Sequence, residues 1–257
     1  MKASRAKTLD SLAGAAAPPG EAEAHLVASD ERMGELIARV GPLLLPPGRV
    51  RSTFDALAES IVYQQLNGKA AATIHGRLCG LFQRGEVHPE GLLAFADGDL
   101  RGAGLSRGKT LALRDLAERT LAGTVPTVEQ LHAMTDDAIV ESLVKVRGIG
   151  RWTAEMLLIF RLGRSDVLPS TDYGIRNGFM LTYRKRSLPT PDEIERRGEK
   201  WRPYRTAASW YLWRAVDLAK VQAAAPPPKA KAVVSPVKPM AAKKSAGKLA
   251  RAKSSRR

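Results

Sequence analysis

The chain has 257 residues, with 41 Lys and Arg against 26 Asp and Glu, and a single cysteine, Cys79. One cysteine excludes an internal disulfide and any zinc or iron–sulfur site held by several cysteines. No run of about eighteen apolar residues suggests a membrane span, and no secretory signal is visible. The net charge of +15 favours a polyanionic partner, with nucleic acid first and an anionic membrane surface second.

In chain order, the sequence predicts a flexible leader at residues 1–21 and an all-α body at residues 22–220. Apolar residues recur with helical spacing over about 53–66, 70–81 and 111–121. Ser52 or Thr53 can cap the first of these helices, Thr135 opens a helix before Asp136, and Thr190 opens another before Pro191. A last helix is expected over about 203–220. No convincing run of alternating strands occurs, which favours a helical core.

Residues 221–257 form a basic tail rich in Lys, Ala and Pro. Residues 222–257 contain ten Lys or Arg and no acidic residue, so they carry 10 of the 15 net charges. Such a segment lacks the apolar surface needed to offset chain entropy, and we expect it to be disordered. It is interpreted as an arm that binds DNA phosphates without sequence preference, or alternatively as a solubilising tail.

Residues 136–162 are typical of two helices joined by a glycine turn. In the sequence VRGIGRWTA at 146–154, Gly148 and Gly150 allow positive φ and close approach of another backbone. The N–H groups of this turn and of the new helix would face outward, where Arg147 and Arg151 could help to bind a phosphate. The pattern predicts a helix–hairpin–helix clamp on a nucleic-acid backbone. An ordinary helical hairpin with a glycine cap is the alternative.

Asp172, in the sequence LPSTDY at 168–173, falls at the expected start of another helix about twenty residues after the hairpin. An aspartate at such a position usually only caps its helix. Its spacing from the hairpin favours a second role, because the hairpin would hold DNA beside this helix end.

Residues from about 50 to 217 resemble the helix–hairpin–helix DNA glycosylases, and within them the 3-methyladenine-DNA glycosylase II group. The resemblance rests on IVYQQL at 61–66, GIGRWTA at 148–154, LPSTDYGIRNG at 168–178, and WRPYR at 201–205 through Trp213. It implies two helical subdomains flanking a DNA-binding cleft, in a compact form without the extra N-terminal α/β domain of the bacterial type member. We expect a monomer, located in the cytoplasm of a bacterium or the nucleus of a eukaryote.

The resemblance implies a monofunctional enzyme that flips an alkylated base, such as 3-methyladenine, out of double-stranded DNA. It then hydrolyses the N-glycosidic bond to start base excision repair. Asp172 matches the catalytic aspartate, which would stabilise the cationic sugar and could also act on the attacking water. Trp152 stands where bifunctional relatives carry a lysine, so no strand cleavage (AP lyase activity) is expected. No choice among preferred alkylated bases follows from the sequence.

The base pocket implied by the resemblance is aromatic, since a cationic base binds well against aromatic faces. It would contain Trp152, Trp213, Phe160 and Met156, the last at a position where the type member has tyrosine. Trp201 and Trp210 are interpreted as core residues.

A wedge side chain would fill the gap that a flipped base leaves. Gln65 occupies that position by alignment of the motif, and Leu66 is the other candidate. No cofactor is required, although hairpins of this superfamily often bind a monovalent cation, sodium or potassium. The carbonyl groups of Val144, Val146 and Ile149 would be its ligands.

Three other functions remain open from the sequence. A non-catalytic helix–hairpin–helix protein that only binds DNA is the main alternative, and the matched Asp172, Trp152 and Trp213 argue against it. A bifunctional lyase for oxidised bases is disfavoured by Trp152. Binding of the tail to a membrane surface is disfavoured because the tail has no apolar face.

Overall fold

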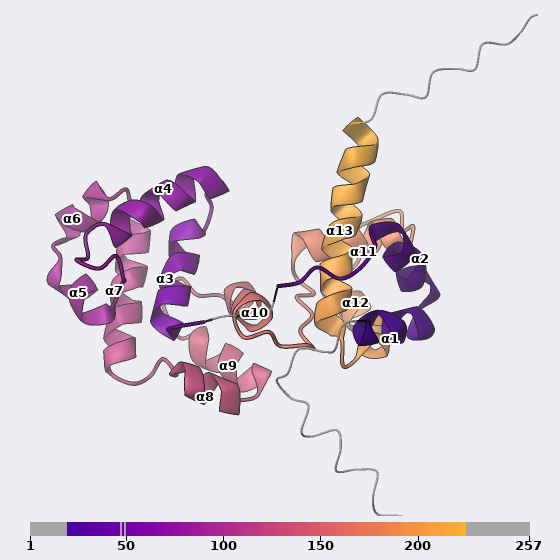
Figure 1. Cartoon of the computed structure of the whole chain (residues 1–257), viewed down its shortest axis with the longest axis horizontal. Coiled ribbons are helices and arrows are strands. Elements are labelled where there is room, and N and C mark those ends of the chain that lie inside the picture. The colour runs from indigo at the N-terminus through magenta and orange to yellow at the C-terminus, as the bar shows by residue number, and fades with distance from the viewer. Residues whose placement is uncertain (1–19, 47, 49, 225–257) are drawn as a thin grey trace, which may run out of the picture. The chain divides into compact units, whose positions relative to one another are not determined.

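The computed structural model describes residues 20–46, 48 and 50–224, and this part of the chain is helical with no β-strand (Figure 1). The helices are α1 (Glu21–Ser29), α2 (Glu31–Val40), α3 (Thr53–Tyr63), α4 (Gly68–Cys79), α5 (Pro89–Ala94), α6 (Asp97–Gly102), α7 (Arg107–Leu121), α8 (Val128–Ala133), α9 (Asp136–Leu143), α10 (Arg151–Phe160), α11 (Tyr173–Thr182), α12 (Pro191–Gly198), the 3-10 turn η2 (Glu199–Trp201) and α13 (Arg205–Ala224). The predicted all-α class is confirmed. Within the described residues, no helix is both long and apolar enough to span a bilayer.

The outer boundaries of the body differ slightly from those predicted. Helix α1 already begins at Glu21, and α13 continues through Ala224, four residues beyond the predicted end. The rest of the predicted leader and the tail from residue 225 lie outside the described residues.

Side-chain caps fix where several helices begin. The hydroxyl of Ser52 accepts the N–H of Asp55, that of Thr135 accepts the N–H of Ala138, and that of Thr190 accepts the N–H of Glu193. These bonds satisfy N–H groups that the first turn of a helix leaves without a partner. The three predicted starts are therefore confirmed.

The end of α3 was predicted too late. The helix stops at Tyr63 rather than continuing to Leu66, because Gln64 already has a non-helical ψ of 135° and Gln65 has a positive φ of 56°. Asn67 then caps α4 by accepting the N–H of Ala70 at 2.9 Å. Leu66 therefore lies in an exposed turn between two helices and not on the apolar face of α3.

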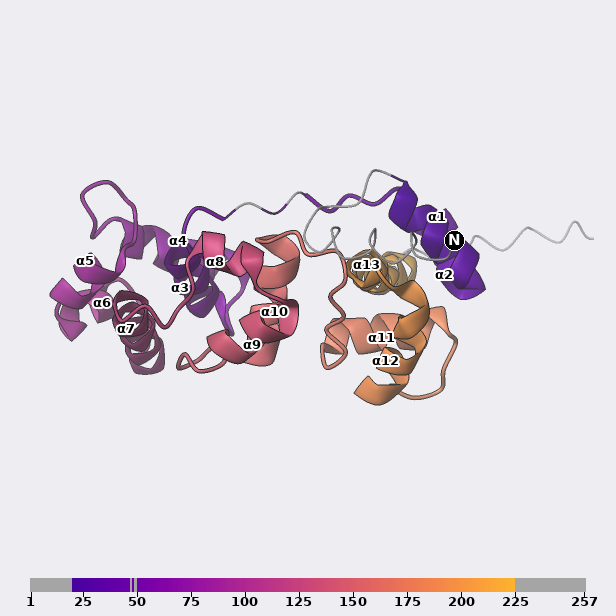
Figure 2. The ribbon, with the colours of Figure 1, turned by 90° about the horizontal axis from the view of Figure 1, so that it is seen from below.

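The described residues build two hydrophobic cores. The first is built from residues 54–167, with fully buried side chains such as Leu57, Leu113 and Leu143. The second combines α1 and α2 with α11–α13 and encloses Trp201 and Tyr211. Figures 1 and 2 both show α1 and α2 beside α11–α13, although they are far apart in the sequence. Trp201 and Trp210 are buried, as expected for core residues.

A buried carboxylate ties the N-terminal helices to the second core. Arg197 on α12 donates to both carboxylate oxygens of Asp30, at 2.6 and 2.8 Å, and Tyr183 and Trp201 also donate to Asp30. Burial alone would raise the pKa of Asp30, but these hydrogen bonds lower it to about 2. Asp30 also accepts the N–H of Met33 and so caps α2.

Candidate active site

Asp172 lies at the N-terminus of α11, where its side chain caps the helix. The carboxylate oxygen Oδ1 accepts the N–H of Ile175 at 2.8 Å, and the backbone of Asp172 has extended dihedral angles. The cap orients the carboxylate at a helix end that favours negative charge. The predicted position of Asp172 is confirmed.

Two tryptophan side chains hold the same carboxylate from different helices. The indole N–H of Trp152 on α10 donates to Asp172 Oδ2 at 2.7 Å, and that of Trp213 on α13 donates to Oδ1 at 2.9 Å. Among the described residues, no Lys, Arg or His forms an ion pair with Asp172. Neutral donors therefore fix the orientation of the carboxylate and leave its negative charge uncompensated by a cation.

Aromatic side chains gather around this carboxylate. Trp152, Met156 and Phe160 are spaced four residues apart on α10, so they share one face of that helix. Trp152 is 47% exposed and Phe160 is 40% exposed, and Phe160 stacks on Trp213 with ring centroids 5.8 Å apart. The structure thus brings the aromatic residues of the predicted base pocket together beside Asp172.

Only one of the two glycines in the hairpin before α10 has a positive φ. Gly148 has a φ of +79°, whereas Gly150 is extended at −95° and stands at the N-cap of α10. The sequence indicates only that both glycines can adopt a positive φ, and the structure uses that freedom at Gly148 alone. A Cβ at Gly150 would meet no atom within 4 Å, so the turn is open to solvent there.

The hairpin presents unpaired backbone donors. The N–H of Ile149 bonds to the carbonyl of Val146 at 3.1 Å, whereas those of Gly148, Gly150 and Arg151 have no acceptor in the described part of the chain. These donors stand at the positive end of α10, which is the arrangement that binds an anion.

The two arginines of the hairpin lie differently. The Arg147 backbone N–H is taken by Asp115 at 2.7 Å, while its side chain is exposed. The Arg151 guanidinium forms an ion pair with Glu155 at 2.9 Å, so its charge is shared with a buried carboxylate. Glu155 stands four residues after Arg151 in the same helix, a spacing that places two side chains side by side, so this pair could have been read from the sequence.

The predicted wedge residues lie beside the hairpin. Gln65 and Leu66 are exposed in the turn between α3 and α4. The neighbouring Gln64 side chain donates to the carbonyl of Gly148 at 2.8 Å, which connects the two turns directly.

Comparison with known proteins assigns the family. Residues 58–203, more than half of the chain, match the HhH-GPD superfamily base excision DNA repair proteins. This chain belongs to the HhH-GPD superfamily. It is 36% identical to DNA-3-methyladenine glycosylase 1 of Schizosaccharomyces pombe over 203 residues. The aligned region covers 77% of this chain and 88% of that protein.

Solved structures of other HhH-GPD proteins are similar over most of the body. A 3-methyladenine DNA glycosylase of Schizosaccharomyces pombe in complex with abasic DNA has a TM-score of 0.70 at 36% identity, covering 77% of this chain and 98% of that chain. A DNA-3-methyladenine glycosidase from Bacillus halodurans has a TM-score of 0.72 at 34% identity, and the match covers 78% of this chain and 92% of that chain.

Sequence reasoning missed the role of Gly174 in this HhH-GPD site. A Cβ at Gly174 would lie 2.8 Å from Cδ1 of Trp213 and 3.0 Å from Oδ1 of Asp172. The missing side chain therefore leaves the space in which the indole reaches the carboxylate. The only signal in the sequence is a glycine two residues after the aspartate.

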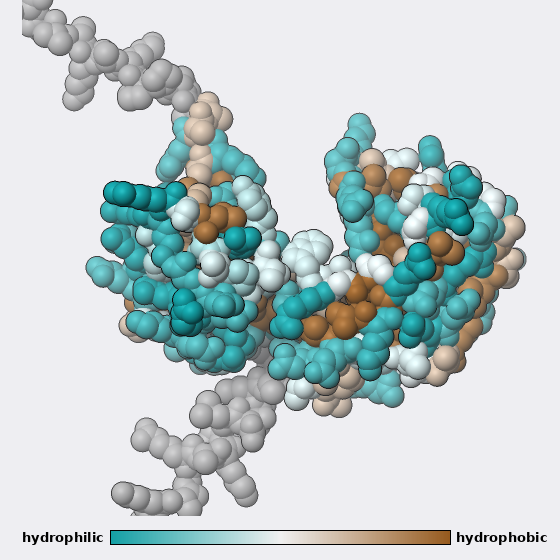
Figure 3. Space-filling view, turned by 180° about the vertical axis from the view of Figure 1, so that it is seen from behind, coloured by the Kyte–Doolittle hydropathy of each residue, from teal (hydrophilic) through white to brown (hydrophobic). Residues whose placement is uncertain are grey.

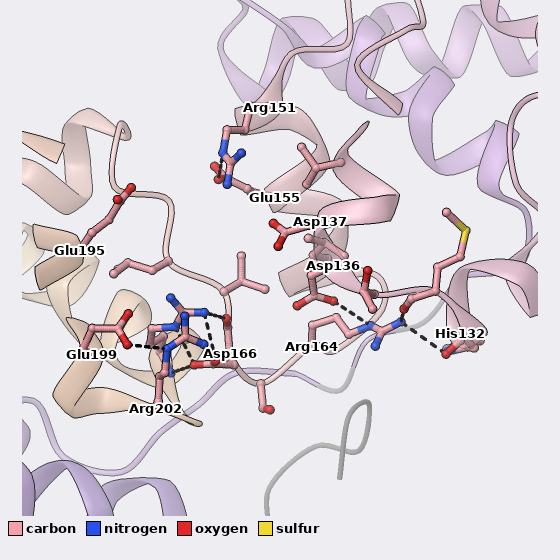
Figure 4. A pocket seen from close by; sticks show the side chains of 18 of the residues that line it. His132, Asp136, Asp137, Arg151, Glu155, Arg164, Asp166, Glu195, Glu199 and Arg202 are labelled. Carbon is pink, nitrogen blue, oxygen red and sulfur yellow. Dashed lines mark hydrogen bonds and ion pairs between the residues drawn. The ribbon is translucent and has the colours of Figure 1, made fainter. Parts of the chain in front are cut away.

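A separate cavity in the HhH-GPD fold is polar, and the aromatic residues beside Asp172 do not line it. Its volume is about 630 Å³, and its labelled lining side chains are carboxylates, arginines and His132 (Figure 4). Asp166 bonds to Arg202 and Arg205, and buried Arg164 pairs with Asp136. Since most of these charges are already paired, we interpret the cavity as a structural ion-pair network.

The surface is hollowed between the two subdomains. Figure 3 shows a notch between the part that carries α13 and the part built on the first core, with apolar side chains gathered below it. The notch fits the DNA-binding cleft that the sequence predicts for an HhH-GPD protein.

Proposed function

We propose that this protein is a monofunctional DNA glycosylase that removes alkylated bases, 3-methyladenine and related ones, from double-stranded DNA. The observation that carries the proposal is the Asp172 carboxylate held between the indole N–H groups of Trp152 and Trp213. The names of the similar proteins, DNA-3-methyladenine glycosylases, support the same substrate class.

The aromatic side chains receive the flipped base. An N3-alkylated adenine is cationic, and a cation is attracted to the faces of Trp and Phe rings. The exposed rings of Trp152 and Phe160, with Trp213 stacked behind Phe160, offer such faces. The pocket thus favours cationic bases, which are also the bases that leave the sugar most readily.

Asp172 supports the bond cleavage. As the bond between the sugar C1′ and the base nitrogen breaks, the electron pair leaves with the base and neutralises its charge. The sugar then carries the positive charge, which the carboxylate stabilises. A water oxygen attacks C1′, and its proton passes to Asp172 or to solvent.

Hydrolysis without strand cleavage follows from Trp152. A lyase needs an amine that forms a Schiff base with the opened sugar, and an indole nitrogen is not such a nucleophile. The product is then an intact strand with an abasic site. Borohydride should trap no covalent adduct between protein and DNA, and a trapped adduct would show that another amine of the chain attacks the sugar.

The released bases provide the direct test. Alkylated genomic DNA is incubated with the protein, and the released bases are identified by mass. We expect methylated purines from the parent protein and none from Asp172→Asn. Tight DNA binding without base release would instead support a non-catalytic helix–hairpin–helix DNA-binding protein, whose hairpin donors alone would explain that binding.

The hairpin would also hold a monovalent cation. The carbonyls of Val144 and Ile149 accept no hydrogen bond within the described residues, and that of Val146 accepts only one. Neutral oxygen donors of this kind suit Na⁺ or K⁺ and would help to bind a DNA phosphate on the same turn. Exchange of K⁺ for a large organic cation at constant ionic strength should weaken DNA binding.

We propose that the protein acts as a monomer. Light scattering of the protein, alone and with a short duplex, should give one copy per DNA molecule. Two copies per duplex would contradict this.

A further inference from the structure

The turn that carries the wedge is held in an unfavourable backbone conformation. Gln65 has a φ of 56° without being a glycine, and its side chain is exposed. A left-handed residue of this kind costs free energy, so neighbouring contacts have to maintain it. The contacts that do so are on α7.

Lys109 on α7 holds the end of α3. Its ammonium group donates to the carbonyls of Val62 and Gln64 at 2.7 and 2.9 Å. These are carbonyls that the last turn of a helix leaves without a partner, at the end where a cation is favoured. Burial lowers the pKa of Lys109, and no carboxylate in the described residues forms an ion pair with it. Its charged hydrogen bonds therefore go to the residues just before Gln65.

The same face of α7 also holds the hairpin. Lys109, Ala112 and Asp115 are spaced three residues apart, so they lie along one side of the helix. Asp115 accepts the N–H of Arg147 at 2.7 Å, and Ala112 is close enough that a Cβ on Gly148 would lie 3.1 Å from its own.

A third contact closes the arrangement. The side chain of Gln64 donates to the carbonyl of Gly148 at 2.8 Å, so the wedge turn and the hairpin are joined to each other as well as to α7. One rigid helix thus sets the distance between the turn that would enter the base stack and the turn that would bind the strand.

We infer that Lys109 is a positioning residue for the wedge, and that α7 couples entry of Gln65 and Leu66 into the base stack to the grip of the hairpin on the strand. This inference rests on the proposed function, because a wedge is needed only where a base is flipped. Lys109 acts through the turn and not on the reacting atoms.

The test measures wedge insertion without any chemistry. A duplex carries a tetrahydrofuran abasic analogue with 2-aminopurine as the neighbouring base, whose fluorescence rises when it is unstacked. At saturating protein we expect Lys109→Met to give a clearly smaller rise than the parent, although the protein is bound. Lys109→Arg, which keeps a charged donor, should restore part of the rise, and the exposed Lys200→Met is the matched control.

The outcomes separate a positioning role from a structural one. A full rise with Lys109→Met would overturn the inference, and so would the absence of any rise with the parent. If Lys109→Met does not fold by circular dichroism, Gln64→Ala removes the contact with Gly148 and is judged in the same way. Failure of the parent to release alkylated bases would refute the proposed function separately, because the fluorescence readout needs no excision.

Discussion

The indole N–H of Trp152 donates a hydrogen bond of 2.7 Å to Asp172 Oδ2, although the two residues lie on different helices and 20 positions apart. A tryptophan that is expected to form an aromatic wall of the pocket therefore also orients the carboxylate. The ring and the N–H of Trp152 perform separable tasks, which substitutions can distinguish.

Replacement of Asp172 by asparagine should reduce base excision by at least about a hundredfold, because the negative charge facing the sugar is lost. The amide can still cap α11, so the fold and duplex binding should be retained. Single-turnover excision and binding to an abasic duplex measure the two effects. Asp192→Asn, an exposed residue on α12, is the control, and a near-normal rate for Asp172→Asn would remove Asp172 from this role.

Replacement of Trp152 by phenylalanine keeps an aromatic face and removes the N–H. We expect roughly a tenfold lower excision rate at saturating enzyme, the effect of losing one hydrogen bond to a charged group. Phe160→Leu keeps both indole contacts and should weaken substrate binding more than the rate. If Trp152→Phe and Phe160→Leu changed the excision rate and substrate binding in the same proportion, Trp152 would act only as an aromatic wall of the base pocket.

Gly174→Ala should displace Trp213 from the carboxylate, because the new Cβ would lie 2.8 Å from the indole Cδ1. The excision rate should fall, with roughly the tenfold loss of one charged hydrogen bond. Gly98→Ala is a matched control, since a Cβ there meets no atom within 4 Å. A crystal structure of Gly174→Ala with Trp213 unmoved would contradict the explanation.

Truncation after Ala224 tests the basic arm predicted from the sequence and leaves α13 complete. It removes ten basic residues and no acidic one. Loss of phosphate contacts should weaken duplex affinity and flatten its dependence on salt, while single-turnover excision on bound DNA is unchanged. An unchanged salt slope would show that the tail does not bind DNA.

Acid should weaken the link between Asp30 and Arg197. The pKa of Asp30 is lowered from 3.8 to about 2 in the folded protein. At pH values above the unfolded pKa, the ionised carboxylate therefore adds about 2 kcal/mol to the free energy of unfolding. This contribution is lost as the pH falls through the folded value. In urea unfolding at neutral pH, the free energy of unfolding of the parent should exceed that of Asp30→Asn by this amount, and the difference should shrink below about pH 4. A difference that does not change with pH would assign the effect to packing.

Local contacts were predictable from the sequence, whereas contacts between distant segments were not. Ser52, Thr135, Thr190 and Asp172 each cap a helix by reaching three residues along the chain, so the pattern alone reveals them. The hydrogen bond from Lys109 to the carbonyl of Val62, 47 residues away, has no such local signal, and neither does the positive φ of Gln65 just after α3.

The candidate site divides in the same way. The resemblance brought Asp172 and its aromatic neighbours together, and the structure places them in contact. The space at Gly174 depends on how α11 packs against α13, and no residue spacing encodes that packing. The pairing of Arg151 with Glu155 is local, because residues four apart are neighbours on one helix, and the sequence could have indicated it. Residue type alone also left open which hairpin glycine turns the chain, because a glycine that can adopt a positive φ, such as Gly150, need not do so.

The contact of Asp30 with Arg197 spans 167 positions and has a consequence for biogenesis. The first core uses one continuous stretch of chain and can assemble while translation proceeds, whereas α1 and α2 must wait for α11–α13 to emerge from the ribosome. The half of the protein that supplies Asp172 is therefore the last to close, and the catalytic carboxylate reaches its place only after the hairpin has been made.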